Sequence, residues 1–355
     1  MLMVIFGAGA SYDSAHAYPV GQGDGLVWRP PLANDLFSNP QRAFSDIVKS
    51  YPKLTHILLY LRERSSGRSV EEELELLRDE AKEYAERSRE LVSVQYYLRD
   101  LLFAVTNTWI HQTDGVTNYA SLMGEILRLN REQEAVCLVT FNYDLLLDNA
   151  LLSFRYQPQE PEDQFKAHPI IKLFKPHGSV DWARVLKLPR DRQLSRQEII
   201  EKADSVEFTG QFTSIGEPIR DSHPEGKTLM PAIAIPLQNK TEDTFACPPS
   251  HLTYLRELLP SVTKILIIGW QAHEAHFLQI LRSGLNKERL NHIMVVGKDS
   301  QGASSILTYF ADQIGHLPPN NSVASWGFSQ FVVNREGASF LQAPSKPPKE
   351  PVASK

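Results

Sequence analysis

Two short stretches decide the expected fold: Leu138-Val139-Thr140-Phe141-Asn142-Tyr143-Asp144 and Lys175-Pro176-His177-Gly178-Ser179-Val180-Asp181-Trp182. Each stretch places polar residues at the end of an apolar run. Residues Ala135 to Val139 predict a buried strand, and the apolar residues after Tyr143 predict a helix. The polar residues of the first stretch therefore fall on the turn between a strand and a helix.

The second stretch repeats this pattern, because Ile170 to Phe174 is an apolar run and His177 lies just beyond its end. In an open parallel sheet, ligands bind in the crevice outside the carboxyl ends of the strands. We therefore expect the amide of Asn142, the carboxylate of Asp144 and the imidazole of His177 to converge in one crevice.

The amino-terminal segment carries a second sign of a ligand-binding sheet. Leu2 to Phe6 is an apolar run that leads into Gly7-Ala8-Gly9-Ala10-Ser11. A glycine turn at the start of a helix lets backbone N–H groups approach a phosphate. The turn lacks the third glycine of the dinucleotide fingerprint, so a tight turn without a ligand is an equal alternative. Ser11 either caps the helix or contacts the phosphate.

Two further strands are expected in the carboxyl-terminal half of the chain. Lys264 to Gly269 is the clearest buried run after Ala135 to Val139, and His292 to Gly297 is another run with a glycine at its exit. Because strands alternate with helices, the expected fold class is α/β with a parallel, doubly wound sheet.

Residues 40–132 have helical spacing, with a capping box predicted at Ser69 and Glu72. We interpret this segment as a large helical module inserted between the first and second strands. Residues 1–342 are expected to form one domain that contains this module. Residues 343–355 are rich in Pro, Lys and Ser and are expected to be a disordered tail.

The composition excludes several function classes. The chain has 355 residues, 42% hydrophobic side chains and a formal charge of -5, which is typical of a soluble globular protein and not of a nucleic-acid binder. No apolar run approaches the roughly 20 residues that span a bilayer. No basic region precedes the first apolar run, so we expect a cytoplasmic protein.

The sequence also predicts no metal. The two cysteines, Cys137 and Cys247, cannot form a zinc ribbon or a disulfide framework. His273, Glu274 and His276 lie within about one helical turn, but they have no further ligands in the sequence pattern.

Taken together, the glycine turn at residues 7–11, the Asn-x-Asp at residues 142–144, Lys175 to Ser179 and Ile268 to Phe277 resemble the sirtuin family, in its divergent SIR2-like bacterial branch. The resemblance implies a Rossmann-like parallel sheet of the SIR2/DHS-like NAD-binding type, with the glycine turn at the pyrophosphate. It places Asn142 and Asp144 at the ribose and nicotinamide, and it makes His177 the catalytic histidine. The NAD-binding residues that we infer with it are Gly7, Ala8, Gly9, Ala10, Ser11, Arg29, Thr140, Phe141, Gly178, Gly269, Trp270, Gly297 and Lys298.

Several of these assignments have plain structural alternatives. Arg29 either pairs with a phosphate as a charge-assisted donor or forms a surface salt bridge. Gly269 would let the backbone approach the adenosine half of NAD, and Gly297 and Lys298 either flank the adenine or mark an ordinary strand exit. Taken singly, His177 is a turn residue and the Asn-x-Asp a helix cap as readily as a site. Their combination favours the site.

Two departures from the pattern of deacetylating sirtuins change which function we expect. Deacetylating sirtuins carry a four-cysteine zinc ribbon, which this chain cannot form, and a large helical insertion is typical of SIR2-like effectors in bacterial antiviral defence. The resemblance then implies an NAD+ hydrolase that releases nicotinamide and ADP-ribose and depletes the infected cell of NAD+. It also implies a homo-oligomer or a partner defence protein, for example a HerA-type ATPase, a short Argonaute or a nucleotide-sensing subunit. The alternatives are a catalytically silent subunit that binds NAD or ADP-ribose, and a zinc-less protein deacylase.

The expected chemistry assigns a role to each polar residue of the crevice. Cleavage of the nicotinamide glycosidic bond develops positive charge at the ribose C1', so the site must hold ribose and water and exclude bulk solvent. His177 would accept a proton from water or a ribose hydroxyl near neutral pH. Asn142 would offer a donor and an acceptor to orient that group, and Asp144 would hold the carboxamide of the leaving nicotinamide.

Overall fold

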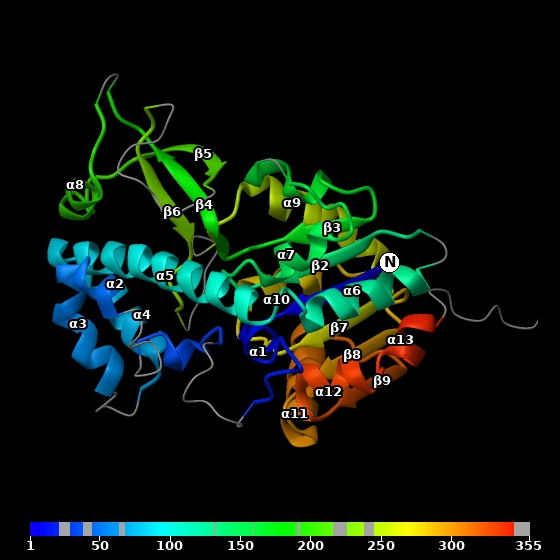
Figure 1. Ribbon diagram of the computed structural model, residues 1–355. Coiled ribbons are helices and arrows are strands. Elements are labelled where there is room, and N and C mark those ends of the chain that lie inside the picture. Colours follow the sequence, from blue (N-terminus) through cyan, green and yellow to red (C-terminus); the bar gives the residue numbers. More distant parts are fainter. Residues whose placement is uncertain are drawn as a thin grey trace, which may run out of the picture.

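The computed structural model describes residues 1–20, 29–37, 45–63, 68–130, 133–158, 160–189, 192–215, 226–237 and 245–343. These residues form two lobes, each built around a sheet of its own (Figure 1). No described helix combines the length and the apolar character that a membrane crossing requires. The expected tail lies outside the described residues, apart from Ala343.

The main lobe is built on a six-stranded parallel sheet. Its strands, in spatial order, are β3 (Ile171–Phe174), β2 (Val136–Thr140), β1 (Leu2–Phe6), β7 (Lys264–Ile268), β8 (His292–Val296) and β9 (Asn320–Ala324). Every neighbouring pair is parallel. The strand order reverses between β1 and β7, which is the switch point where doubly wound sheets bind ligands.

The expected α/β, Rossmann-like architecture is thereby confirmed, and all five strands expected in the sheet are present. The sixth strand, β9, was not predicted. Its residues Asn320 to Val323 are exposed or half-buried, because β9 lies at the edge of the sheet. An edge strand of this kind lacks the continuous apolar run that identifies a buried parallel strand.

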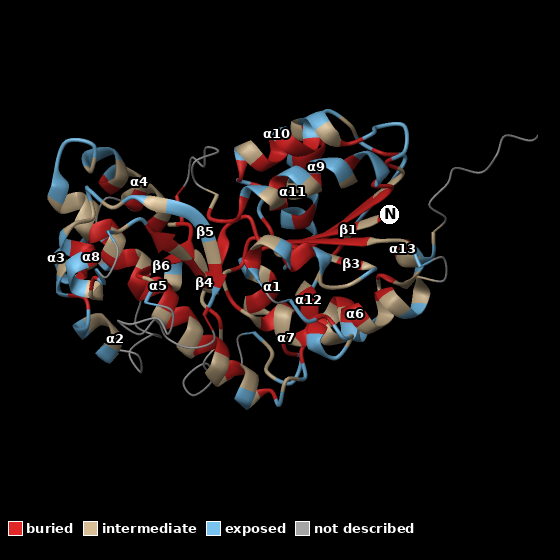
Figure 2. Cartoon of the chain, turned by 90° about the horizontal axis from the view of Figure 1, so that it is seen from above, coloured by how far each residue is buried: buried red, intermediate tan, exposed pale blue. Residues whose placement is uncertain are grey.

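Helices cover both faces of the main sheet, as Figure 2 shows from above. Side chains alternate between the faces along a strand, so Met3 and Ile5 pack on one side and Val4 and Phe6 on the other. The first face is covered by α9 (Pro249–Leu258), α10 (Ala275–Gly284) and α11 (Ser300–Ile314). The second is covered by α6 (Asn118–Leu129), α7 (Leu146–Leu152), α12 (Gly327–Val333) and α13 (Ala338–Gln342).

The second lobe combines helices with a small antiparallel sheet. The sheet has the order β5 (Phe208–Ser214), β4 (Gly178–Leu186) and β6 (Leu229–Ile233). It packs against α5 (Ala85–Gln112), and the remaining helices of this lobe are α2 (Ser45–Lys49), α3 (Pro52–Glu63), α4 (Val70–Glu80) and α8 (Arg196–Glu201). The main lobe also contains the short α1 (Ala8–Tyr12), and the described part of the chain has 3-10 turns at η1 (Ala33–Asp35), η3 (Pro161–Lys166) and η5 (Leu259–Ser261).

The helices of the expected module, residues 40–132, therefore pack in both lobes. Its early helices, with the capping box at Ser69 and Glu72 present as predicted, share a core with the small sheet. The helix α6, by contrast, packs on the main sheet through Tyr119 and Met123. The carboxyl-terminal end of α5 reaches the main lobe as well, where Trp109 Nε1 donates a hydrogen bond to Ser14 Oγ at 2.9 Å. The long helix α5 thus connects the two lobes.

Candidate active site

Parallel pairing aligns the carboxyl ends of five strands in one row. Phe6 lies opposite Thr140 and Ile268, Ile268 lies opposite Val296, and Val296 lies opposite Ala324. The residues that follow these positions share one edge of the sheet. The expectation that the glycine turn and the Asn-x-Asp lie at the same end of the sheet is thereby confirmed.

Asn142 is the centre of the hydrogen bonds at this edge. Its Nδ2 donates to the carbonyl oxygen of Gly7 at 3.0 Å, to Ser11 Oγ at 2.8 Å and to Tyr119 OH at 3.2 Å. Its backbone N–H donates to Thr140 Oγ1 at 3.2 Å. Because a carbonyl oxygen only accepts, Gly7 fixes which end of the amide faces the turn. The amide oxygen Oδ1 must then face the other way.

The amide oxygen is consequently the part of Asn142 that remains for a ligand. Among the described residues, none donates a hydrogen bond to Asn142 Oδ1. The sequence suggested that this amide offers both a donor and an acceptor. In the structure both N–H groups are engaged within the protein, so Asn142 offers an acceptor alone.

Ser11 and Asp144 complete the polar cluster around Asn142. The N-cap of α1 is Gly7, so the structure does not place Ser11 at the cap; its Oγ instead lies 3.0 Å from Tyr119 OH. Burial raises the pKa of the Asp144 carboxyl, and hydrogen bonds from the Ser11 hydroxyl and the Leu146 N–H oppose that rise. Asp144 Oδ1 accepts the Leu146 N–H at the first residue of α7 at 3.0 Å, but the N-cap of α7 is Leu145, so Asp144 is not the helix cap that the sequence offered as an alternative.

Lys175 connects the turn that contains Asp144 to the start of β4 by hydrogen bonds. Its ammonium group is fully buried and donates to the carbonyl oxygen of Asp144 at 3.0 Å, to Asp148 Oδ2 at 2.8 Å and to Ser179 Oγ at 2.7 Å. These partners come from the turn after β2, from α7 and from β4. Sequence reasoning did not single out this residue, although a lysine directly after the apolar run of β3 was the available signal.

His177 lies in aromatic surroundings and is 1% exposed. Its ring centroid is 4.8 Å from that of Phe141 and 6.1 Å from that of Tyr143. Phe141 in turn stacks on Trp270 at 5.2 Å. The residues on both sides of Asn142 therefore contact the imidazole, which brings the two motifs together.

The backbone after His177 enters the small sheet at once. Gly178 has a φ of +79°, and a Cβ there would lie 1.8 Å from the carbonyl oxygen of Ala232. The His177 carbonyl oxygen accepts a hydrogen bond from Ala234 N at 2.8 Å. The glycine is therefore explained by close packing between strands, and the imidazole is anchored where the two lobes meet.

The glycine turn packs against the exit of β7. The N–H of Gly7 donates to the Ile268 carbonyl at 3.1 Å, and the N–H of Gly9 donates to the Gly269 carbonyl at 3.0 Å. A Cβ on Gly7 would lie 2.6 Å from the Gly269 oxygen, and one on Gly9 would lie 2.9 Å from the Gly269 Cα. Gly7 and Gly9 therefore allow the backbone of the turn to pack directly against the backbone of Gly269. Ala8 is exposed at the start of α1, whereas Ala10 is buried.

Gly297 and Lys298, the residues expected at the adenine, form hydrogen bonds between the end of β8 and the end of the edge strand β9. The N–H of Gly297 donates to the Ala324 carbonyl at 3.0 Å, and the Lys298 carbonyl accepts from Trp326 N at 3.1 Å. These contacts are those of an ordinary strand exit. That Gly297 and Lys298 flank the adenine stays a prediction. Trp326, which is 74% exposed at this edge, was not noticed in the sequence.

Arg29 holds the loop that follows α1. Its guanidinium donates to the carbonyl oxygens of Tyr12, Tyr18 and Pro19, each at 3.2 Å, and lies over the Tyr12 ring at 5.0 Å. Within the described residues, no carboxylate is among these partners, so the salt-bridge alternative is not seen there. A phosphate contact stays a prediction.

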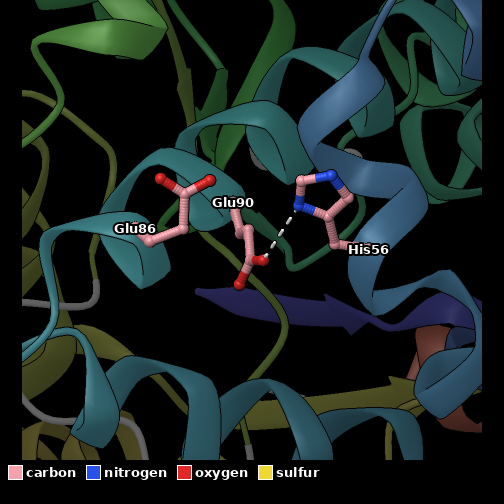
Figure 3. Close-up of side chains that lie close together, drawn as sticks. All are labelled: His56, Glu86 and Glu90. Atoms are coloured by element: carbon pink, nitrogen blue, oxygen red, sulfur yellow. Dashed lines mark ion pairs between the residues drawn. The ribbon is translucent and has the colours of Figure 1, made fainter.

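Within the described residues, one group of side chains has its ligand atoms close enough to hold a metal: His56, Glu86 and Glu90 (Figure 3). Its carboxylates already pair with cations, because Glu86 binds Lys53 at 2.8 Å and Glu90 binds Arg87 at 2.6 Å. A metal ion would have to displace these ion pairs. We therefore interpret the group as part of the ion-pair network between α3 and α5.

The weak metal pattern of His273, Glu274 and His276, at the start of α10, also has a structural explanation. Glu274 accepts a hydrogen bond from Trp270 Nε1, and the His276 ring packs near Phe245 at 5.3 Å. His273 is exposed. Glu274 and His276 thus contact aromatic side chains.

Two of three comparisons with known proteins found a match. A family model described as a SIR2-like domain matches residues 136–313. Among solved structures, a mutant of a Sir2 homologue in complex with 2'-O-acetyl ADP-ribose matches with 14% sequence identity and a TM-score of 0.39, over 97% of this chain and 93% of that chain. No curated protein matches. Because the family model covers half of the chain, from the start of β2 to Gln313 in α11, and includes both Asn142 and His177, the chain belongs to the SIR2-like domain family.

Proposed function

We propose that this protein hydrolyses NAD+ to nicotinamide and ADP-ribose. The observation that carries the proposal is the placement of Asn142 and His177 just beyond the ends of the neighbouring strands β2 and β3. The rings of Phe141 and Tyr143, on either side of Asn142, both contact the His177 ring. The family match supports an NAD-related activity.

In the proposed reaction, a water oxygen bonds to the ribose C1' while the bond from C1' to nicotinamide breaks. The electron pair of that bond returns to the pyridinium nitrogen, so nicotinamide leaves as a neutral molecule. The water gives up a proton to His177, which later releases it to solvent. The reaction consumes one water and needs no other co-reactant.

The remaining site residues have supporting roles in this proposal. Asn142 Oδ1 accepts a hydrogen bond from the attacking water or a ribose hydroxyl and thereby orients it toward C1'. Asp144 holds the carboxamide of nicotinamide. The pyrophosphate is assigned to the backbone N–H of Ala8, an exposed residue at the start of α1, because the N–H groups of Gly7 and Gly9 are already engaged.

The burial of the site supports a regulated activity. His177 is 1% exposed and Asn142 is 7% exposed, so substrate reaches them only after neighbouring side chains such as Trp270 move. We propose that oligomerisation or a partner defence protein favours the open form, and that NAD+ depletion then protects a bacterial population from phage. The same burial also favours the second candidate, a subunit that binds NAD or ADP-ribose without cleaving it.

The test incubates the purified chain with NAD+ and measures nicotinamide release, with and without an acyl-lysine peptide. We expect release without peptide, and a loss of about 10²- to 10⁴-fold in His177→Ala and in Asn142→Ala. Calorimetry with NAD+ and thermal melts on each variant separate lost chemistry from lost binding or folding. Binding without any release would favour the silent subunit, and release that depends on the peptide would favour a deacylase.

A further inference from the structure

Tyr119 is the residue of the polar cluster that no sequence motif contains. It is the second residue of α6, whose start is capped by Thr117, and it is 1% exposed. Its ring meets Phe6 edge-on at 5.1 Å and Phe328 at 5.4 Å. The ring is therefore fixed by packing, and its hydroxyl points to the end of β1.

The hydroxyl has two partners from different parts of the chain. It lies 3.0 Å from Ser11 Oγ and accepts a hydrogen bond from Asn142 Nδ2 at 3.2 Å. Burial raises the pKa of the Tyr119 hydroxyl well above its usual value, so the group stays protonated. A protonated hydroxyl can accept from Asn142 and still form its bond with Ser11.

We propose that Tyr119 is a positioning residue that holds the Asn142 amide in the orientation needed for NAD+ cleavage, an inference that rests on the proposed function. Gly7 determines which end of the amide faces inward. It does not by itself fix the tilt of the amide plane, because a single hydrogen bond leaves rotation about the side-chain bond. The Tyr119 hydroxyl, at 3.2 Å, acts together with Ser11 Oγ, at 2.8 Å, as a lateral contact on Nδ2 and restricts that rotation.

The consequence concerns the chemical step more than substrate binding. A displaced Asn142 Oδ1 would still accept a hydrogen bond from substrate or water, but along a less productive direction. Misplacement of a catalytic group mainly lowers the rate, because geometry matters most in the transition state. The expected signature is a loss in kcat with little change in KM.

The experiment compares Tyr119→Phe with Tyr156→Phe. The first substitution removes the hydroxyl and keeps the ring. Tyr156 is the matched control, since it is fully buried in the same lobe and its hydroxyl donates to the Gln164 carbonyl at 2.8 Å, away from Asn142. We expect Tyr119→Phe to lower kcat for nicotinamide release about 10-fold with KM nearly unchanged, and Tyr156→Phe to change stability alone.

A double variant tests whether Tyr119 acts through Asn142. If it does, Tyr119→Phe combined with Asn142→Ala should be no slower than Asn142→Ala alone. Additive losses, or full kcat in Tyr119→Phe, would overturn the positioning role while the NAD+ hydrolase proposal stands. A wild-type protein that releases no nicotinamide would instead refute the proposed function, and the positioning role with it.

Discussion

The carbonyl oxygen of Gly7 accepts a hydrogen bond from Asn142 Nδ2 at 3.0 Å across 135 residues of sequence. This contact joins the glycine turn after β1 to the polar turn after β2. It sets the orientation of the amide, since reversal would bring two oxygen atoms to hydrogen-bond distance with no proton between them. The candidate base His177 contacts Phe141 and Tyr143, the residues on either side of Asn142 in the same turn.

Replacement of Asn142 by aspartate should therefore harm the protein more than replacement by alanine. At neutral pH, Asn142→Asp places a carboxylate oxygen against the Gly7 carbonyl, and an unsatisfied buried polar contact costs about 1–3 kcal/mol or more when charged. Asn142→Ala only removes the donor. Urea unfolding at pH 7 compares the two variants. Equal or greater stability of Asn142→Asp would show that the amide is oriented differently.

The sequence predicted the parts of this site that follow apolar runs. Asn142 and His177 were found because each comes directly after a continuous run that only a buried parallel strand explains. Tyr119 was not found, because an aromatic residue at helical spacing looks like an ordinary core residue, and its partner Ser11 lies 108 residues away. Its function depends on a tertiary contact that no local pattern encodes.

In the small sheet, the apolar run from Leu229 to Pro236 predicted a short strand, where β6 is found, but β4 and β5 escaped prediction for a related reason. Helices of the early module bury their apolar faces against β4 and β6, which come much later in the chain. In β5, residues Phe208 to Gln211 are half-buried or exposed, so no apolar run identifies the strand. Lys175 was similarly hidden, because its three partners become visible only after the lobes are assembled.

The glycine turn gives a second prediction, in which Gly9→Val destabilises the fold. The sequence suggested that a side chain here would block a phosphate, whereas the structure places the Gly269 Cα 2.9 Å from a Cβ at this position. Overpacking of this kind typically costs about 1–3 kcal/mol. Ala8→Val is the control, since Ala8 is exposed. Thermal melts should show a clear drop for Gly9→Val alone, and equal melting temperatures would contradict the contact.

Asp144 provides a pH-dependent prediction. Burial raises the pKa of its carboxyl above the usual 3.8, so the folded protein binds this proton more tightly than the unfolded chain. The associated stabilisation is present below pH 3.8 and is lost as pH rises through the raised pKa. Asp144→Asn removes this loss and should be more stable than wild type at pH 7, with the difference shrinking toward acid pH. Unfolding measured across this range tests the sign, and a difference that grows toward acid pH would refute it.

The last prediction concerns the buried ion pair between Lys175 and Asp148, whose atoms are 2.8 Å apart. Lys175→Met should destabilise the protein by about 3–5 kcal/mol, because it leaves Asp148 without its cation and removes the contacts that connect the turn after β2 to β4. Asp148→Asn on its own should cost less, since the Lys175 ammonium keeps the Asp144 carbonyl and Ser179 Oγ as partners. A double-mutant cycle measured by urea unfolding isolates the pair. If the two losses simply add, the ion pair does not contribute, and the motif around His177 must be held by the backbone contacts of Gly178 and Ala234 instead.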